Sequence, residues 1–164
     1  MLRILLAVLM LTTPAFAEQE TDKSVEAFKK ESAPLQNVVE EVVNSALPGF
    51  SGVLEHAKAT YIDGYGVVVS LEVTLEPGYS PFSTPKTPSE LKSLTAKRRK
   101  EIEENLERLL KDRVAKLQCL GDSDALTIAM HLFNAHPVDL PNLPTQIQLT
   151  LKKQAPDHVI RREF

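Results

Sequence analysis

Four stretches of the chain alternate apolar and polar residues with a period of two, and this pattern limits the fold more than any other feature. The clearest stretch runs from Val67 to Glu76, where valine or leucine occupies every second position. Similar alternation occurs over residues 57–62, 126–133 and 147–152. Because successive side chains of a strand point to opposite faces, each stretch predicts a strand with one apolar and one mostly polar face. Four such strands predict a sheet that is covered on one side only.

The first two predicted strands are joined by a tight-turn signal. Asp63-Gly64 tolerates the positive φ of a two-residue hairpin turn, and Gly66 beside it predicts a bulge or a close approach of another backbone. The segment Tyr61–Val69, with the sequence YIDGYGVVV, resembles a hairpin found in uncharacterised exported bacterial proteins. That resemblance implies a bacterial source and the periplasm, but no activity, cofactor or catalytic residue.

Two further stretches repeat apolar residues at helical spacing. Ser32 is a suitable N-cap for the first helix, with Pro34 in its first turn and Pro48-Gly49 after its end. The many valines of this stretch are poor helix formers, so the helix should depend on packing for its stability. Thr87-Pro88-Ser89-Glu90 is a capping box, and it predicts that a second helix begins there and runs to about Leu120.

The order of these elements predicts an α+β domain with two layers. Helix, two strands, helix and two strands (α-β-β-α-β-β) give a four-stranded, mainly antiparallel sheet with both helices on one face. We expect this single domain to span residues 34–154, after a flexible lead-in over residues 18–33 and before a charged C-terminal tail over residues 155–164. A domain of this size can bury about two-thirds of its unfolded surface.

Residues 1–17 have the layout of a cleavable secretory signal peptide. Arg3 gives a positive start, residues 4–11 are apolar, and Ala15-Phe16-Ala17 places small residues before an acidic stretch. The apolar run is shorter than the roughly 20 residues that span a bilayer. We therefore expect cleavage after Ala17 and a periplasmic or secreted protein with no membrane span after cleavage. An uncleaved anchor is the alternative.

Charge and cysteine content restrict the partners and the chemistry. The formal net charge of −3 does not favour binding to nucleic acid or to an anionic membrane. Cys119 is the only cysteine, so it cannot form an internal disulfide, and we expect a buried small hydrophobe rather than a nucleophile. Acidic residues follow the basic run Lys97–Lys100 at pairing distance, which predicts a solvated helix face.

Motifs for catalysis and for metal binding are weak. The four histidines lack the spacing that places two ligands on one helix face, and we predict no metal and no cofactor. The stretch from His131 to Asp139 holds two imidazoles and a carboxylate, but it runs from a strand into a loop. Glu72 and Glu76 are interpreted as solvated residues of an open strand face. A small exported hydrolase that uses His131 or His136 is the alternative to a role without catalysis.

Two features favour an interaction role. One is the polar face of the sheet, which should be open although it carries apolar residues. The other is the loop over residues 77–88, which contains four prolines and could present its aromatic residues to a partner. The predicted binding residues lie on this face and in this loop: Val68, Glu72, His131, Phe133, Tyr79 and Phe82. We therefore expect a non-catalytic binding module for an unknown protein or envelope component, with a homodimer as one form.

Overall fold

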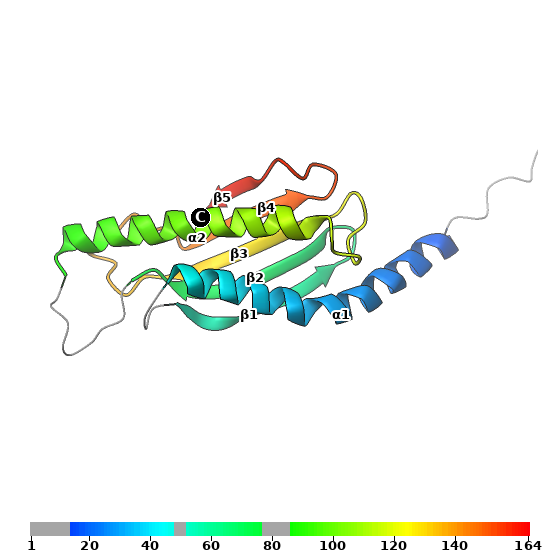
Figure 1. Ribbon diagram of the computed structural model, residues 1–164, viewed down its shortest axis with the longest axis horizontal. Helices are drawn as coiled ribbons and strands as arrows, with labels where there is room; N and C mark the ends of the chain where they lie inside the picture. Colours follow the sequence, from blue (N-terminus) through cyan, green and yellow to red (C-terminus); the bar gives the residue numbers. More distant parts are fainter. Residues whose placement is uncertain (1–13, 48–51, 77–85) are drawn as a thin grey trace, which may run out of the picture.

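The structure, a computed structural model, describes residues 14–47, 52–76 and 86–164, with side chains described from residue 22 onward. It contains two helices and five strands in the order α-β-β-α-β-β-β. Figure 1 shows both helices on the same face of the sheet. The elements and their bounds are α1 (Pro14–Ala46), β1 (Val53–Ile62), β2 (Gly66–Thr74), α2 (Pro88–Val114), β3 (Ala125–Phe133), β4 (Gln146–Lys152) and β5 (Ile160–Glu163).

The five strands form one mixed sheet in the order β1-β2-β3-β4-β5. Only β2 and β3 pair in parallel, and the other three pairs are antiparallel. A parallel pair needs a long crossover connection, which α2 supplies. The α+β class is thus confirmed, but the prediction of four strands was wrong. The predicted tail contains β5, whose sequence Ile-Arg-Arg-Glu lacks the apolar alternation by which the other strands were found.

α1 is much longer than expected, because it covers residues 18–33, which were predicted to be a flexible lead-in. The predicted start at Ser32 was wrong, and Pro34 lies inside the helix. Tertiary contacts on the N-terminal side of the proline explain this. The Phe28 ring lies 6.0 Å from the ring of Tyr61. The Glu31 carboxylate also accepts hydrogen bonds from the backbone N–H groups of residues 118 and 119, at 2.9 and 3.1 Å.

Most of the predicted signal peptide, residues 1–13, lies outside the described residues. The helix α1 begins at Pro14, so the predicted cleavage point after Ala17 falls within its first turns. Among the residues that the structure describes, no helix combines the length and the apolar character needed to cross a membrane.

The second helix begins as the capping box predicts. The Thr87 hydroxyl accepts a hydrogen bond from the Glu90 backbone N–H at 3.3 Å, and the Glu90 carboxylate accepts one from the Thr87 N–H at 2.8 Å. The helix ends at Val114 rather than near Leu120. The residues that follow form turns, and part of their backbone is bonded to Glu31 instead of continuing the helical ladder.

The hydrophobic core lies between the helices and the apolar face of the sheet. The alternation of β2 is confirmed, because Val67, Val69, Leu71 and Val73 are buried while the residues that alternate with them are partly exposed. Burial of one such side chain stabilises the fold by about 1.5–3 kcal/mol. The largest fully buried side chains come mainly from α2, β3 and β4, with one from α1 and two from positions directly after α1 and β2: Ile102, Leu106, Leu110, Leu126, Ile128, Met130, Ile147, Leu149, Leu151, Val39, Leu47 and Leu75.

The β1–β2 hairpin is confirmed, with a three-residue turn instead of the expected two-residue turn, since Ile62 pairs with Gly66. Gly66 has a φ of +116°, and a Cβ atom there would lie 2.2 Å from the carbonyl oxygen of Ala125. The predicted close approach of a second backbone is therefore present. Gly66 and Ala125 are also the first pair of the parallel β2–β3 ladder.

Replacement of Gly66 by alanine should lower the free energy of unfolding by about 2–4 kcal/mol, because it adds backbone strain and a clash with β3. Gly64→Ala is the matched control. Gly64 also has a positive φ, of 70°, but no atom lies within 4 Å of the position of its Cβ. The Gly64→Ala substitution should lower the free energy of unfolding by about 1–2 kcal/mol, through backbone strain alone. Urea denaturation measures the free energy of unfolding of both variants. An equal decrease for the two would contradict the conclusion that the β2 and β3 backbones approach closely at Gly66.

Cys119 is fully buried, as predicted for a residue that packs as a small hydrophobe. Burial is the main cause that raises the pKa of its thiol to about 12, and the nearby Glu31 carboxylate raises it further. Thiolate is therefore scarce at neutral pH, and it is the thiolate that reacts.

Ellman's reagent should accordingly fail to label Cys119 in the native protein at pH 7.5 and should label it fully in denaturant. The measurement is the absorbance of the released thionitrobenzoate over time. Labelling of the native protein at the rate of a free cysteine would show that the thiol is accessible and the burial argument wrong.

Candidate functional site

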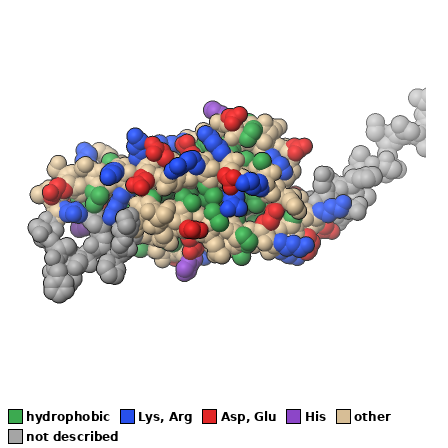
Figure 2. Space-filling model, viewed as in Figure 1, with side chains coloured by type: hydrophobic (Ala, Val, Ile, Leu, Met, Phe, Trp, Pro, Cys, Tyr) green, Lys and Arg blue, Asp and Glu red, His purple; other side chains and the backbone are tan. Residues whose placement is uncertain are grey.

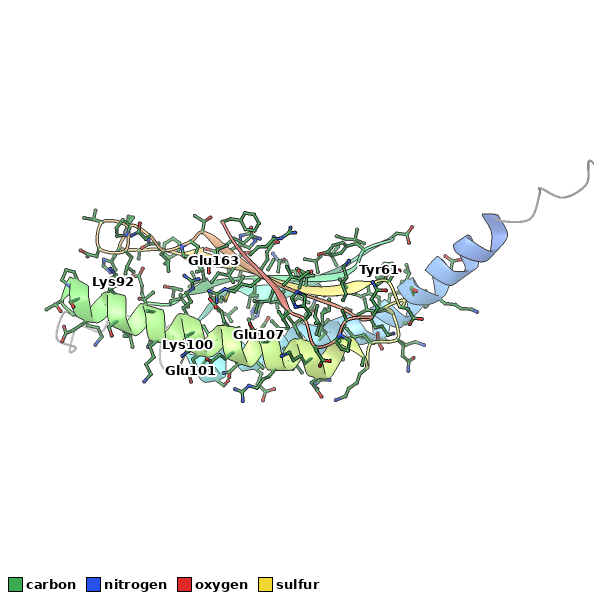
Figure 3. The ribbon with its side chains drawn as sticks, turned by 90° about the horizontal axis from the view of Figure 1, so that it is seen from above. Tyr61, Lys92, Lys100, Glu101, Glu107 and Glu163 are labelled. Carbon is green, nitrogen blue, oxygen red and sulfur yellow. The ribbon has the colours of Figure 1, made fainter. Side chains whose placement is uncertain are left out.

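The polar face of the sheet is open within the part of the chain that the structure describes, because both helices pack on the other face (Figures 1 and 3). Strand register divides this open face into rows that run across the strands. One row, here called the basic row, contains Lys58, Ser70, Ala129, Gln148 and Arg162. The next row, here called the acidic row, contains Glu55, Glu72, His131 and Gln146.

Four of the six predicted binding residues lie on the open face. Glu72 and His131 are register partners on β2 and β3, and Val68 lies nearer the β1–β2 turn. Val68 and Glu72 are half-buried, His131 is exposed, and Phe133 is 49% exposed at the end of β3. These residues are spread over the length of the face and do not form one compact cluster. The other two, Tyr79 and Phe82, lie outside the described residues.

One end of the open face is covered by a side chain that the sequence did not indicate. Tyr65 reaches over the sheet from the hairpin turn, and its hydroxyl lies 2.7 Å from Thr127 Oγ1. Thr127 Oγ1 lies 2.9 Å from Thr150 Oγ1 in turn. Thr127 belongs to the polar half of the β3 alternation, but it is only 3% exposed because Tyr65 covers it. Tyr65 itself remains 40% exposed, so this end of the face is partly aromatic.

The histidines of the hydrolase alternative lie apart from each other in the structure. His131 is on the open face, whereas His136 is in the β3–β4 loop with its Nε2 atom 3.4 Å from Glu76 Oε2. The interpretation of Glu76 as a solvated residue was wrong. It is 5% exposed, and its other oxygen accepts a hydrogen bond from the Ala135 N–H at 2.8 Å. This carboxylate therefore holds the start of the loop in place.

A cavity of about 410 Å³ lies between α2, the β3–β4 loop and β5, where sequence analysis predicted no site. Residues from Lys92 to Glu103 line it on one side, residues 139–143 line it on the other, and Arg161 closes one end. His131 and His136 are not among its lining residues, so the hydrolase alternative gains no support from this cavity. Residues from such distant parts of the sequence carry no common motif.

A partly buried ion cluster forms the end of the cavity next to β5. Glu103 is 4% exposed, and its carboxylate accepts hydrogen bonds from Arg99 Nε at 2.8 Å and Arg161 Nη2 at 3.1 Å. Its second oxygen lies 2.6 Å from Arg161 Nη1. Glu163 pairs with both arginines, mainly Arg99, and these contacts hold the pKa of its carboxyl below its usual value. Figure 3 shows Glu163 on the sheet side of α2, with Glu101 on the opposite side of the helix.

The basic run of α2 is only partly the solvated face that its sequence predicts. Lys97 and Lys100 are exposed, and Figure 2 shows basic and acidic side chains interspersed along this helix. Arg98 and Arg99 are half-buried instead, so the prediction was wrong for them. Arg98 donates a hydrogen bond to the Leu75 carbonyl at 3.1 Å, and Arg99 belongs to the ion cluster. The expected pair between Arg99 and Glu103 is present.

Comparison with known proteins gives no assignment for any of these features. In the described part of the chain, no three His, Cys, Asp or Glu residues are grouped so that they could hold a metal ion. No protein-family model, curated protein or solved structure matched the chain. The function has therefore to be inferred from the open face and the cavity themselves.

Proposed function

We propose that the chain is an exported, non-catalytic binding module, and that the open face of its sheet binds a second copy of the chain. The supporting observation is that both ends of this face expose large apolar side chains. Phe133 and Phe164 are 49% and 60% exposed at one end, and Ile62 and Tyr65 are 45% and 40% exposed at the other. Exposed apolar patches mark protein interaction sites, and each end of this face carries two large apolar side chains.

Backbone hydrogen bonds place Phe164 on this face. The Phe164 N–H donates to the Gln146 carbonyl at 3.1 Å, and the Gln146 N–H donates back at 3.3 Å. The two residues are therefore opposite each other, and paired residues share a face. Gln146 belongs to the acidic row, next to His131. Phe164 thus extends that row beyond β4.

The area of the open face is sufficient for a stable dimer. Strands of 10, 9, 9, 7 and 4 residues, at about 3.3 Å per residue and about 4.8 Å apart, give a face of about 600 Å². Two such faces in contact would bury about 1,200 Å², which is at the lower end of the range for specific interfaces. Aromatic residues, which are enriched at such interfaces, lie at both ends of this face.

The charges of the face are self-complementary about one two-fold axis, as a symmetric dimer requires. One possible two-fold axis lies in the plane of the interface, perpendicular to the strands and between the basic row and the acidic row. Rotation about this axis places the basic row of one copy over the acidic row of the other. The same axis places Phe133 of one copy over Thr127 and the Tyr65 ring of the other. An axis parallel to the strands would instead place Lys58 over Arg162, and like charges in contact are unfavourable.

The face is a better site for a partner than the free edge of β1. The Glu40 carboxylate of α1 accepts a hydrogen bond from the Ala57 backbone N–H at 2.6 Å and lies 3.2 Å from His56 Nδ1. A carboxylate that occupies an edge N–H group blocks the addition of another strand there. Association through the face leaves this contact undisturbed.

We expect light scattering to show a dimer, and the Phe133→Glu variant to weaken the dimer by about 2 kcal/mol or more, a change of roughly 30-fold in dissociation constant. The glutamate would bring a charge into the apolar end of the interface. Sedimentation equilibrium of both proteins gives the two constants.

Val138→Glu is the matched control, because Val138 is 91% exposed in the β3–β4 loop and not on the open face. This variant should dimerise like the wild type. Circular dichroism checks that both variants remain folded. The proposal of a second copy would be overturned if the wild-type chain stayed monomeric at 100-fold the protein concentration of a typical sedimentation experiment. Equal effects of the two substitutions on the dissociation constant would overturn it as well.

Export predicts a mature chain that begins at Glu18. The signal layout of residues 1–17 supports this part of the proposal. The full chain, expressed in a bacterium and recovered from the periplasmic fraction, should have the intact mass of residues 18–164. A mass that retains Met1, or recovery only from the membrane fraction, would contradict cleavage.

A further inference from the structure

A buried polar atom beside the cavity at α2 has no hydrogen-bond partner among the described residues. Thr95 lines the cavity and is 3% exposed, and its Oγ1 atom has no hydrogen-bond partner among the described residues. A threonine inside a helix usually bonds to a carbonyl one turn earlier, which this hydroxyl does not. Unpaired buried hydroxyls are destabilising and rare in native proteins, so each requires an explanation. A ligand that bonds to the hydroxyl would provide one.

The walls of the cavity are largely apolar. Ala96 lies beside Thr95 on α2, and Leu140, Pro141 and Leu143 face it from the β3–β4 loop. Its volume of about 410 Å³ falls within the range of small-molecule sites, which are mostly apolar with a few polar groups that orient the ligand. At about 30 Å³ for each water-sized group, the cavity accommodates roughly 14 non-hydrogen atoms.

The charged residues around the cavity favour an anion. Four of its lining residues are basic (Lys92, Arg99, Lys100 and Arg161), and two are acidic (Glu103 and Asp139). Arg99 and Arg161 are paired with Glu103 and Glu163, so this cluster carries no net charge. The remaining charged lining residues are Lys92 and Lys100 against Asp139, which leaves the cavity with a net positive charge. Lys92 and Arg99 are three and four residues from Thr95, so they flank it on the same side of α2.

We propose that this cavity binds a small monocarboxylate with an unbranched apolar tail, of the size of an eight- to ten-carbon fatty acid. The ligand carboxylate accepts a hydrogen bond from the Thr95 hydroxyl between Lys92 and Arg99. The tail lies against Leu140 and Leu143. This site is on the helix side of the sheet, so it does not depend on the dimer proposed for the open face.

Isothermal titration of the full chain with octanoate should show saturable binding of one molecule per chain. Thr95→Val keeps the shape of the side chain and removes only the hydroxyl. It should weaken octanoate binding at least tenfold, while the melting temperature stays the same or rises because an unpaired buried hydroxyl has been removed. Lys92→Gln should weaken binding about three- to tenfold. Lys111→Gln, an exposed lysine of α2 outside the cavity, is the control and should have no effect.

Two further titrations complete the test. 1-Octanol, which has the same tail but no charge, should bind at least tenfold more weakly than octanoate, and so should acetate, which lacks the tail. The Phe133→Glu variant should bind octanoate like the wild type, which separates this site from the open face. Absence of saturation at millimolar octanoate, equal binding of octanol, or unchanged affinity in Thr95→Val would overturn the proposal.

Discussion

The parallel pairing of β2 with β3 is the contact on which the rest of the structure depends. It joins the β1–β2 hairpin to β3, β4 and β5, over nine register pairs from Gly66 with Ala125 to Thr74 with Phe133. Because the two strands run the same way, the chain between them must return along the sheet, and α2 provides that return. The glycine at the first pair allows the two backbones to approach, since any side chain there would meet the Ala125 carbonyl.

This pairing also explains why the two faces of the sheet differ. α1 and α2 lie on the same face and bury the valines and leucines of β2, β3 and β4 beneath them. The opposite face receives no helix, and its residues follow the polar half of the same alternation. One pattern in the sequence therefore determines both the core and the open face, which is why both were predictable together.

Features that depend on local sequence were predicted well, and features that depend on distant contacts were not. Alternation identified β2 to within two residues at each end, and the capping box located the start of α2. Pro34, by contrast, is a local signal for the start of a helix, and contacts of Phe28 and Glu31 with other elements outweigh it. β5 was missed because ionic contacts with α2, not apolar burial, hold Arg161 and Glu163.

The same reasoning separates the two candidate sites. The open face follows from strand periodicity, so four of its proposed residues were named from the sequence. The cavity exists only because the fold brings residues 92–103 of α2 to residues 139–143 of the β3–β4 loop. The one local signal was the pair of Arg99 and Glu103, which looked like an ordinary surface ion pair. The burial of the Arg99–Glu103 pair and its contact with Arg161 depend on β5, which the sequence pattern did not predict.

The ion cluster links these two sites through β5. Buried ion pairs contribute little net stability, because desolvation offsets their attraction, but they fix position strongly. In this four-residue strand, Arg161 and Glu163 point to the cavity side, while Ile160 and Arg162 pair with residues of the open face. Neighbouring residues of β5 therefore belong to different sites, because Arg161 lines the cavity and Arg162 lies in the basic row. If a ligand in the cavity is coupled to a partner on the face, thermodynamic linkage makes that coupling act equally in both directions.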